Sequence, residues 1–166
     1  MPVSSTARSD MTDNYRLADT KFRAAGGVDL ESHQYKAALE YTGKMLHYVQ
    51  DACEPHHSGN EIASPIQDTP HSEFEKDVFE HYTEYSRYYL WDSSEYNQCR
   101  TQSETDIGMI VHRAAVKSHA FIDSVNDLEQ RDEWENIGGI CVRQSIVLSA
   151  ITLRIVLEKM GVLVQL

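Results

Sequence analysis

The sequence has few cysteines and no basic cluster at either end, and these shortages exclude several classes of protein. Its three cysteines, Cys53, Cys99 and Cys141, are far apart and form no Cys-x-x-Cys pair. Neither a thiolate zinc site nor a redox motif is therefore predicted, and a single disulfide stays open. The formal net charge is −11. A protein that coats nucleic acid needs Lys and Arg on one face, so that role is disfavoured. An enzyme that holds a phosphodiester on bound metal ions remains compatible with the acidity.

Long apolar runs are also missing. Residues 1–14 are rich in Ser, Thr and Asp and lack the apolar core of a secretory signal, so we expect them to be disordered. The apolar stretch 137–166 is interrupted by four charged residues, Arg143, Arg154, Glu158 and Lys159. Its uncharged runs are well short of the roughly 20 residues that span a bilayer. We therefore expect no transmembrane segment, while compartment and oligomeric state stay open.

Apolar residues recur at helical spacing, and no stretch shows sustained period-2 alternation. The predicted fold class is all-α, a helical bundle of about four to five helices in one domain over residues 15–166. The expected helices are 15–25, 29 or 32 to about 53, 68 or 69 to about 92, 104 to about 127, and 133 or 139 to about 160.

Residues able to bind a metal gather between His47 and Glu75. His47 and Asp51 are four positions apart, as are His71 and Glu75, and His57 lies between the pairs. Residues i and i+4 of a helix share one face, so each pair can direct two ligands at one point. Zn²⁺ binds imidazole and carboxylate at about 2.0–2.2 Å, and a catalytic zinc takes three protein ligands. One such pair alone is more often a surface helix contact. Two pairs with a third histidine between them favour a metal site.

This stretch resembles the zinc-dependent phospholipase C family of bacteria, which includes the clostridial alpha-toxins. The family pattern His-Tyr-x-x-Asp-x-x-x-Pro-x-His-x-x-Asn, followed by His-x-x-Phe-Glu, is matched by His47, Tyr48, Asp51, Pro55, His57, Asn60, His71, Phe74 and Glu75. The resemblance covers roughly residues 30 to 155 and is closer to these phospholipases than to the related fungal zinc nucleases.

The resemblance implies a function and a ligand set. His57, His71 and Glu75 would hold one zinc, while His47 and Asp51 would serve a second that activates water, with Asp51 bridging to a third. One to three Zn²⁺ per chain would then hydrolyse a phosphodiester with the activated water as nucleophile. The substrate would be a phospholipid or another phosphodiester, and a phospholipid would bring the protein to a membrane surface.

The family's remaining ligands lie further upstream, and the residues before His47 contain no Trp and only one histidine, His33. Three explanations stay open: a truncated chain, a shortened natural variant with one or two metals, or the family fold with another task. The alternatives to a phospholipase are a zinc enzyme on a different substrate, a metal-stabilised helical binding module, and a metal-free helical interaction protein. His56 is expected on the surface or as a donor behind a ligand. The other histidines are expected to be exposed or hydrogen-bonded helix residues.

Overall fold

The fold of the described residues is all-α, as predicted. We analysed a computed structural model that describes residues 7–58, 68–87 and 107–162, and this part of the chain contains helices and turns but no strand. The elements in chain order are α1 (Ala7–Ala25), α2 (His33–Ala52), α4 (Asp68–Arg87), α6 (Gly108–His119), α7 (Ile122–Asn126), the 3₁₀ turn η2 (Leu128–Gln130) and α8 (Arg131–Lys159).

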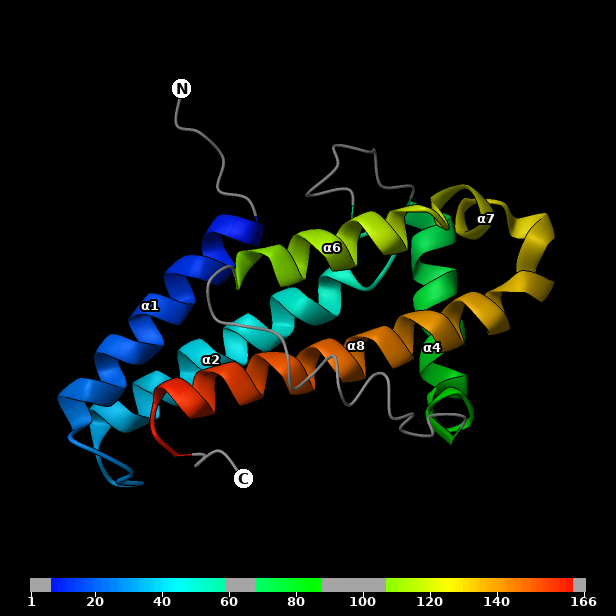
Figure 1. Ribbon diagram of the computed structural model, residues 1–166. Helices are drawn as coiled ribbons and strands as arrows, with labels where there is room; N and C mark the ends of the chain where they lie inside the picture. Colours follow the sequence, from blue (N-terminus) through cyan, green and yellow to red (C-terminus); the bar gives the residue numbers. More distant parts are fainter. Residues whose placement is uncertain (1–6, 59–67, 88–106, 163–166) are drawn as a thin grey trace.

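Four helices, α1, α2, α6 and α8, run along the length of the molecule (Figure 1). α2 contacts all three of the others, and α1 also packs on α6. α4 crosses this group at the end where α2 finishes, and it packs on α8 and on the short helix α7. The last turn of α2 and the first turn of α4 are thereby placed at the same end of the molecule.

The predicted second helix is confirmed, whereas the first helix begins earlier than expected. Ser32 caps α2, and its Oγ accepts a hydrogen bond from the Tyr35 amide at 3.4 Å. α1 begins at Ala7, so the expectation that residues 1–14 are disordered is wrong for residues 7–14. Met11 is fully buried in the core. That apolar contact stabilises a segment whose polar composition alone disfavours a helix.

The helix expected over 104–127 is two helices. Ala120 and Phe121 interrupt it between α6 and α7, and its expected start at residue 104 lies outside the described residues. The turn allows Phe121, Ile122 and Val125 to pack with a second apolar cluster away from the main core. α8 begins at Arg131 and continues to Lys159, as the earlier of the two predicted starts suggested. The expected end of α4 near residue 92 also lies outside the described residues.

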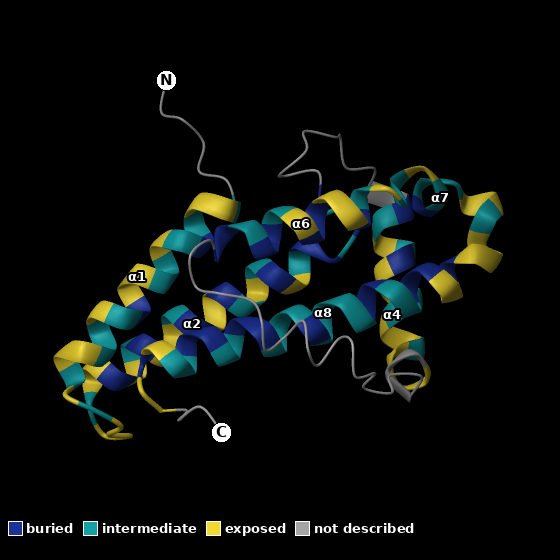
Figure 2. Cartoon of the chain, in the orientation of Figure 1, coloured by how far each residue is buried: buried dark blue, intermediate teal, exposed yellow. Residues whose placement is uncertain are grey.

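The buried residues form two clusters, which Figure 2 shows on the mutually facing sides of the helices. The main core lies between α1, α2, α6 and α8, and its largest fully buried side chains include Met11, Met45, Val49, Val111, Ile151 and Val156. The second cluster contains Phe74, Val125, Trp134, Ile137 and Cys141. Phe74 packs edge-on against Trp134, with 5.6 Å between the ring centroids. Such aromatic pairs add stability beyond their buried area, so this contact fixes the first half of α4 on α8.

α8 is apolar over an unusual length. By length and composition alone, the stretch Leu128–Lys159 would be able to cross a membrane. A long core helix of a soluble protein meets the same criterion, so this observation is weak by itself. In the structure α8 packs on α2 and α4, and Arg154 forms an ion pair with Glu158 along it. The absence of a membrane span therefore stays a prediction.

The surroundings of two helical glycines predict opposite effects of alanine substitution on stability. A Cβ on Gly108 would lie 2.8 Å from Thr12 Oγ1 and 3.0 Å from the Arg8 carbonyl oxygen, because α6 approaches α1 closely there. A Cβ on Gly43, inside α2, would meet nothing within 4 Å. We expect Gly108→Ala to destabilise the fold by about 1–3 kcal/mol through overpacking. Gly43→Ala should stabilise it by about 0.5–1 kcal/mol through helix propensity. Urea unfolding of both variants measures the difference, and equal effects would contradict the close α1–α6 contact.

Candidate metal centre

The turn that follows α2 is held in shape by the carboxylate of Glu54. α2 ends at Ala52, and Pro55 prevents its continuation because it lacks a backbone N–H. Glu54 Oε2 accepts the backbone N–H of His57 at 2.7 Å, and Glu54 Oε1 accepts Nδ1–H of His56 at 2.8 Å. One side chain thus fixes the backbone and the neighbouring imidazole on which the direction of His57 depends.

Three of the predicted ligands converge on one point. His57 Nε2 lies 2.9 Å from His71 Nε2 and 3.3 Å from Glu75 Oε1, and His71 Nε2 lies 3.1 Å from the same carboxylate oxygen. Ligand atoms about 2.0–2.1 Å from a tetrahedral zinc stand about 3.3 Å apart. The triangle is therefore nearly the size that one zinc ion requires, and the donor types fit it. His71 and Glu75 share one face of α4, as the i,i+4 spacing predicted.

The other predicted pair lies beside this triangle. His47 Nε2 is 3.3 Å from Asp51 Oδ2, and the same carboxylate oxygen is 3.9 Å from Nδ1 of His57. His57 consequently presents Nε2 to His71 and Glu75, and Nδ1 to Asp51. The structure thus brings all five predicted ligands into one continuous cluster. Among the described residues, the His47–Asp51 pair has no third ligand as close as those of the triangle.

Glu54 is a functional candidate that the sequence analysis missed. One of its carboxylate oxygens and one ring nitrogen each of His57 and His71 all lie within 4.8 Å of one another. No spacing rule pointed to it, because Glu54 lies past the end of α2 and belongs to neither i,i+4 pair. In the sequence, Glu54 is marked as lying near the predicted ligands only by its position directly before Pro55.

His56 is not a surface residue, contrary to the first of its two expected roles. Its side chain is fully buried, with its ring 5.0 Å from that of His71 and 6.0 Å from that of Phe74, measured between centroids. The second role, a donor behind a ligand, agrees with its hydrogen bond to Glu54. His119 is hydrogen-bonded, as expected of a helix histidine, because its Nδ1 lies 3.2 Å from Ser58 Oγ.

Negative charge is concentrated around the histidines. Asp51, Glu54 and Glu75 all form their ion pairs with histidine, and none pairs with Lys or Arg within the described part of the chain. Carboxylates gathered in one place create a negative potential that a bound cation relieves. The donor set and the charge both fit a divalent metal.

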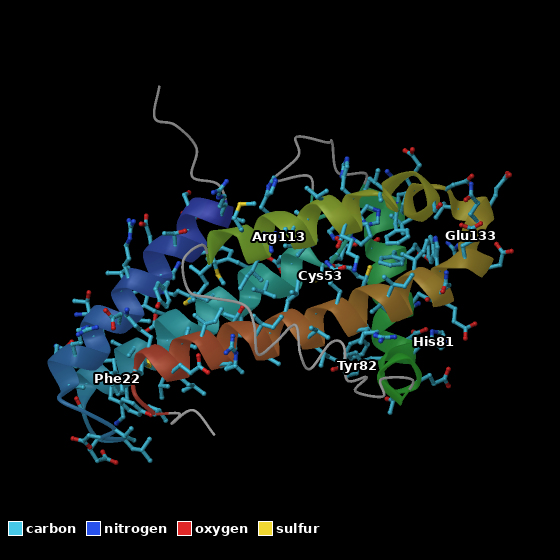
Figure 3. All side chains as sticks on the ribbon, in the orientation of Figure 1. Phe22, Cys53, His81, Tyr82, Arg113 and Glu133 are labelled. Atoms are coloured by element: carbon cyan, nitrogen blue, oxygen red, sulfur yellow. The ribbon has the colours of Figure 1, made fainter. Side chains whose placement is uncertain are left out.

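An apolar groove borders the centre. It has a volume of about 700 Å³ and is formed by the end of α2, by α4 and by α8. Glu54 and Glu75 line it together with apolar side chains that include Phe74, Val78, Ile146 and Leu153. Figure 3 shows Cys53 between the lengthwise helices, whereas His81 and Tyr82 lie on the half of α4 that projects beyond them. Glu54 and Glu75 thus place one side of the centre at the border of a groove suited to apolar groups.

Two buried thiols also line this groove. Burial raises the pKa of Cys53 to about 12. Burial also raises the pKa of Cys141, and the nearby Cys53 and Glu54 add to that rise. Both groups therefore stay protonated at neutral pH, and neither is suited to be a thiolate ligand or a nucleophile.

We expect Cys53 to react very slowly with iodoacetamide in the folded protein. At pH 8, a pKa near 12 leaves about 10³-fold less thiolate than an ordinary cysteine has, and burial restricts access further. A Cys99→Ser variant removes the third thiol, and mass spectrometry counts the adducts before and after unfolding in guanidinium. Rapid alkylation of the folded variant would show that the groove admits the reagent and that the thiols are reactive.

Comparison with known proteins does not assign the chain to a family. No family model, no curated protein and no solved structure matches it. The functional conclusion therefore depends on the geometry of the centre and on the sequence pattern that predicted it.

Proposed function

We propose that the chain is a zinc-dependent hydrolase of phosphodiester bonds, of the phospholipase C type, with metal-activated water as nucleophile. The observation that carries the proposal is the triangle of His57, His71 and Glu75. Its three edges of 2.9, 3.3 and 3.1 Å unite the predicted ligands from two separate segments. An i,i+4 helix contact accounts for the His71–Glu75 edge only, so surface pairing does not explain why His57 joins them.

The residues have distinct roles in this proposal. His57, His71 and Glu75 hold one ion, and His47 with Asp51 offers ligands to a second. Zinc, when bound, lowers the pKa of a coordinated water towards 7 and neutralises charge that develops on phosphoryl oxygens. Asp51 Oδ2 lies between two imidazoles, 3.3 Å from His47 Nε2 and 3.9 Å from His57 Nδ1. His47 is 68% exposed, so this side of the centre is open to a substrate.

The apolar groove favours a phospholipid as the substrate over a fully polar diester. Its walls are mainly apolar, and two of the carboxylates near the histidines stand on its border. A substrate with its phosphodiester at the metal ligands would be able to place apolar groups against Phe74, Val78 and Leu153. Burial of apolar area contributes about 25 cal/mol per Å² to such binding.

A metal-stabilised helical module without this activity is the second candidate. One observation favours it: within the described residues, His47 and Asp51 supply two ligands, whereas a catalytic zinc takes three. In that case the triangle would bind zinc and join the turn after α2 to the start of α4, but the protein would not cleave diesters.

Replacing His57 tests the enzymatic proposal. Zinc-loaded protein should hydrolyse the chromogenic diester bis(p-nitrophenyl) phosphate. His57→Ala should abolish that hydrolysis and lower the zinc content by one ion per chain, because the triangle loses a ligand. The matched control is His81→Ala, since His81 lies on α4 but bonds the Asp77 carbonyl away from the centre. Full hydrolysis by His57→Ala would refute the proposal. Normal zinc content with no hydrolysis in the parent would favour the helical module.

Zinc binding should also make the stability of the protein dependent on pH. A ligand present at 100 times its Kd stabilises the fold by about 2.7 kcal/mol. Imidazole binds zinc only when neutral and ordinarily titrates near pH 6.5, so protons displace the metal as the pH falls below about 6. We therefore expect zinc to raise the Tm at pH 7.5 but not at pH 5. Calorimetry with and without a chelator measures this, and a His57→Ala variant, which loses one of the proposed ions, should show a smaller zinc-dependent shift at pH 7.5 and none at pH 5.

A further inference from the structure

We propose that Glu54 is a fourth protein ligand of the ion held by His57, His71 and Glu75. This inference depends on the proposed metal centre and assigns different roles to its two sites. We call the site formed by His57, His71 and Glu75 the first site. With Glu54 bound, this site is closed and structural, so only the open side at His47 and Asp51 is left to activate water.

The position of Glu54 permits this role. One carboxylate oxygen of Glu54 and one ring nitrogen each of His57 and His71 lie within 4.8 Å of one another, against about 3.3 Å between ligands on one tetrahedral zinc. The approach of Glu54 to these two imidazoles is therefore at most about 1.5 Å, which is small for a side chain with three rotatable bonds. The triangle already holds the other three ligand atoms near their final spacing.

The surroundings of Glu54 leave room for coordination. A carboxylate has about four lone-pair sites, and the two hydrogen bonds from His56 and the His57 amide occupy one on each oxygen. The Glu54 side chain is 18% exposed, whereas that of Glu75 is 50% exposed. A shielded carboxylate with no Lys or Arg partner among the described residues gains more from a cation than an exposed one does.

The number of protein ligands decides what an ion does. Structural zinc sites have four protein ligands, whereas catalytic sites have three and leave one position for water or substrate. A closed first site would join the turn after α2 to the start of α4. It would also exclude exogenous anions, which enter only an open coordination position.

Cobalt(II), a spectroscopic substitute for zinc, tests this proposal through anion access. A His47→Ala background removes the neighbouring pair, so that one equivalent of cobalt reports on the first site alone. We expect azide to leave the visible cobalt spectrum of this protein unchanged. Adding Glu54→Gln should open a position, so that azide then shifts the spectrum. The matched control is Glu80→Gln, a carboxylate on α4 that pairs with Lys76 and is 57% exposed, and it should remain insensitive to azide.

The outcomes separate the two proposals. An azide-dependent spectrum in the His47→Ala background would overturn the role of Glu54 while leaving the metal centre intact, and it needs no variant at Glu54. Failure of that background to bind cobalt would overturn the metal centre itself. If Glu54 only positioned His57, Glu54→Gln would weaken cobalt binding about 10–100-fold without altering the response to azide.

Discussion

The packing of Phe74 on Trp134 is the contact on which the geometry of the centre depends. Phe74 is 1% exposed and lies edge-on to the indole ring, so it determines which face of α4 meets α8. His71 and Glu75 stand on either side of Phe74 in sequence and border the buried face. Their direction towards His57 therefore follows from burial of an aromatic ring, whose free energy is far larger than that of an exposed histidine–carboxylate pair.

The centre also carries an electrostatic cost. Asp51, Glu54 and Glu75 lie near one another in a chain whose formal net charge is −11, and the described residues place no Lys or Arg against them. Like charges that approach in a partly buried region destabilise a fold unless hydrogen bonds or a cation offset them. For Glu54 the hydrogen bonds are present, through His56 and the His57 amide. For Asp51 and Glu75 the partners are imidazoles, which are weak counter-charges when neutral.

Short-range patterns predicted the parts of the site that depend on helix geometry. The pair His71 and Glu75 converges because i,i+4 residues share a face, and the all-α fold follows from the periodicity. The patterns did not reveal Glu54 or the burial of His56, because a turn after a proline has no fixed periodicity. The prediction of disorder is also wrong for residues 7–14, where burial of Met11 outweighs a polar composition. Such long-range contacts are decided by packing, which one sequence does not display.

His57 connects the two halves of the cluster, and this explains why the turn after α2 is so closely fixed. Its Nε2 faces His71 and Glu75, while its Nδ1 faces Asp51. A rotation of the ring about its Cβ–Cγ bond would lose both relations at once. The hydrogen bond from the His57 amide to the Glu54 carboxylate restricts the turn, and so does Pro55, which ends the helix. Neither restraint involves the ring nitrogens of His57. Both ring nitrogens therefore remain available to the two halves of the cluster. A histidine that contacted only one half would need only one available nitrogen.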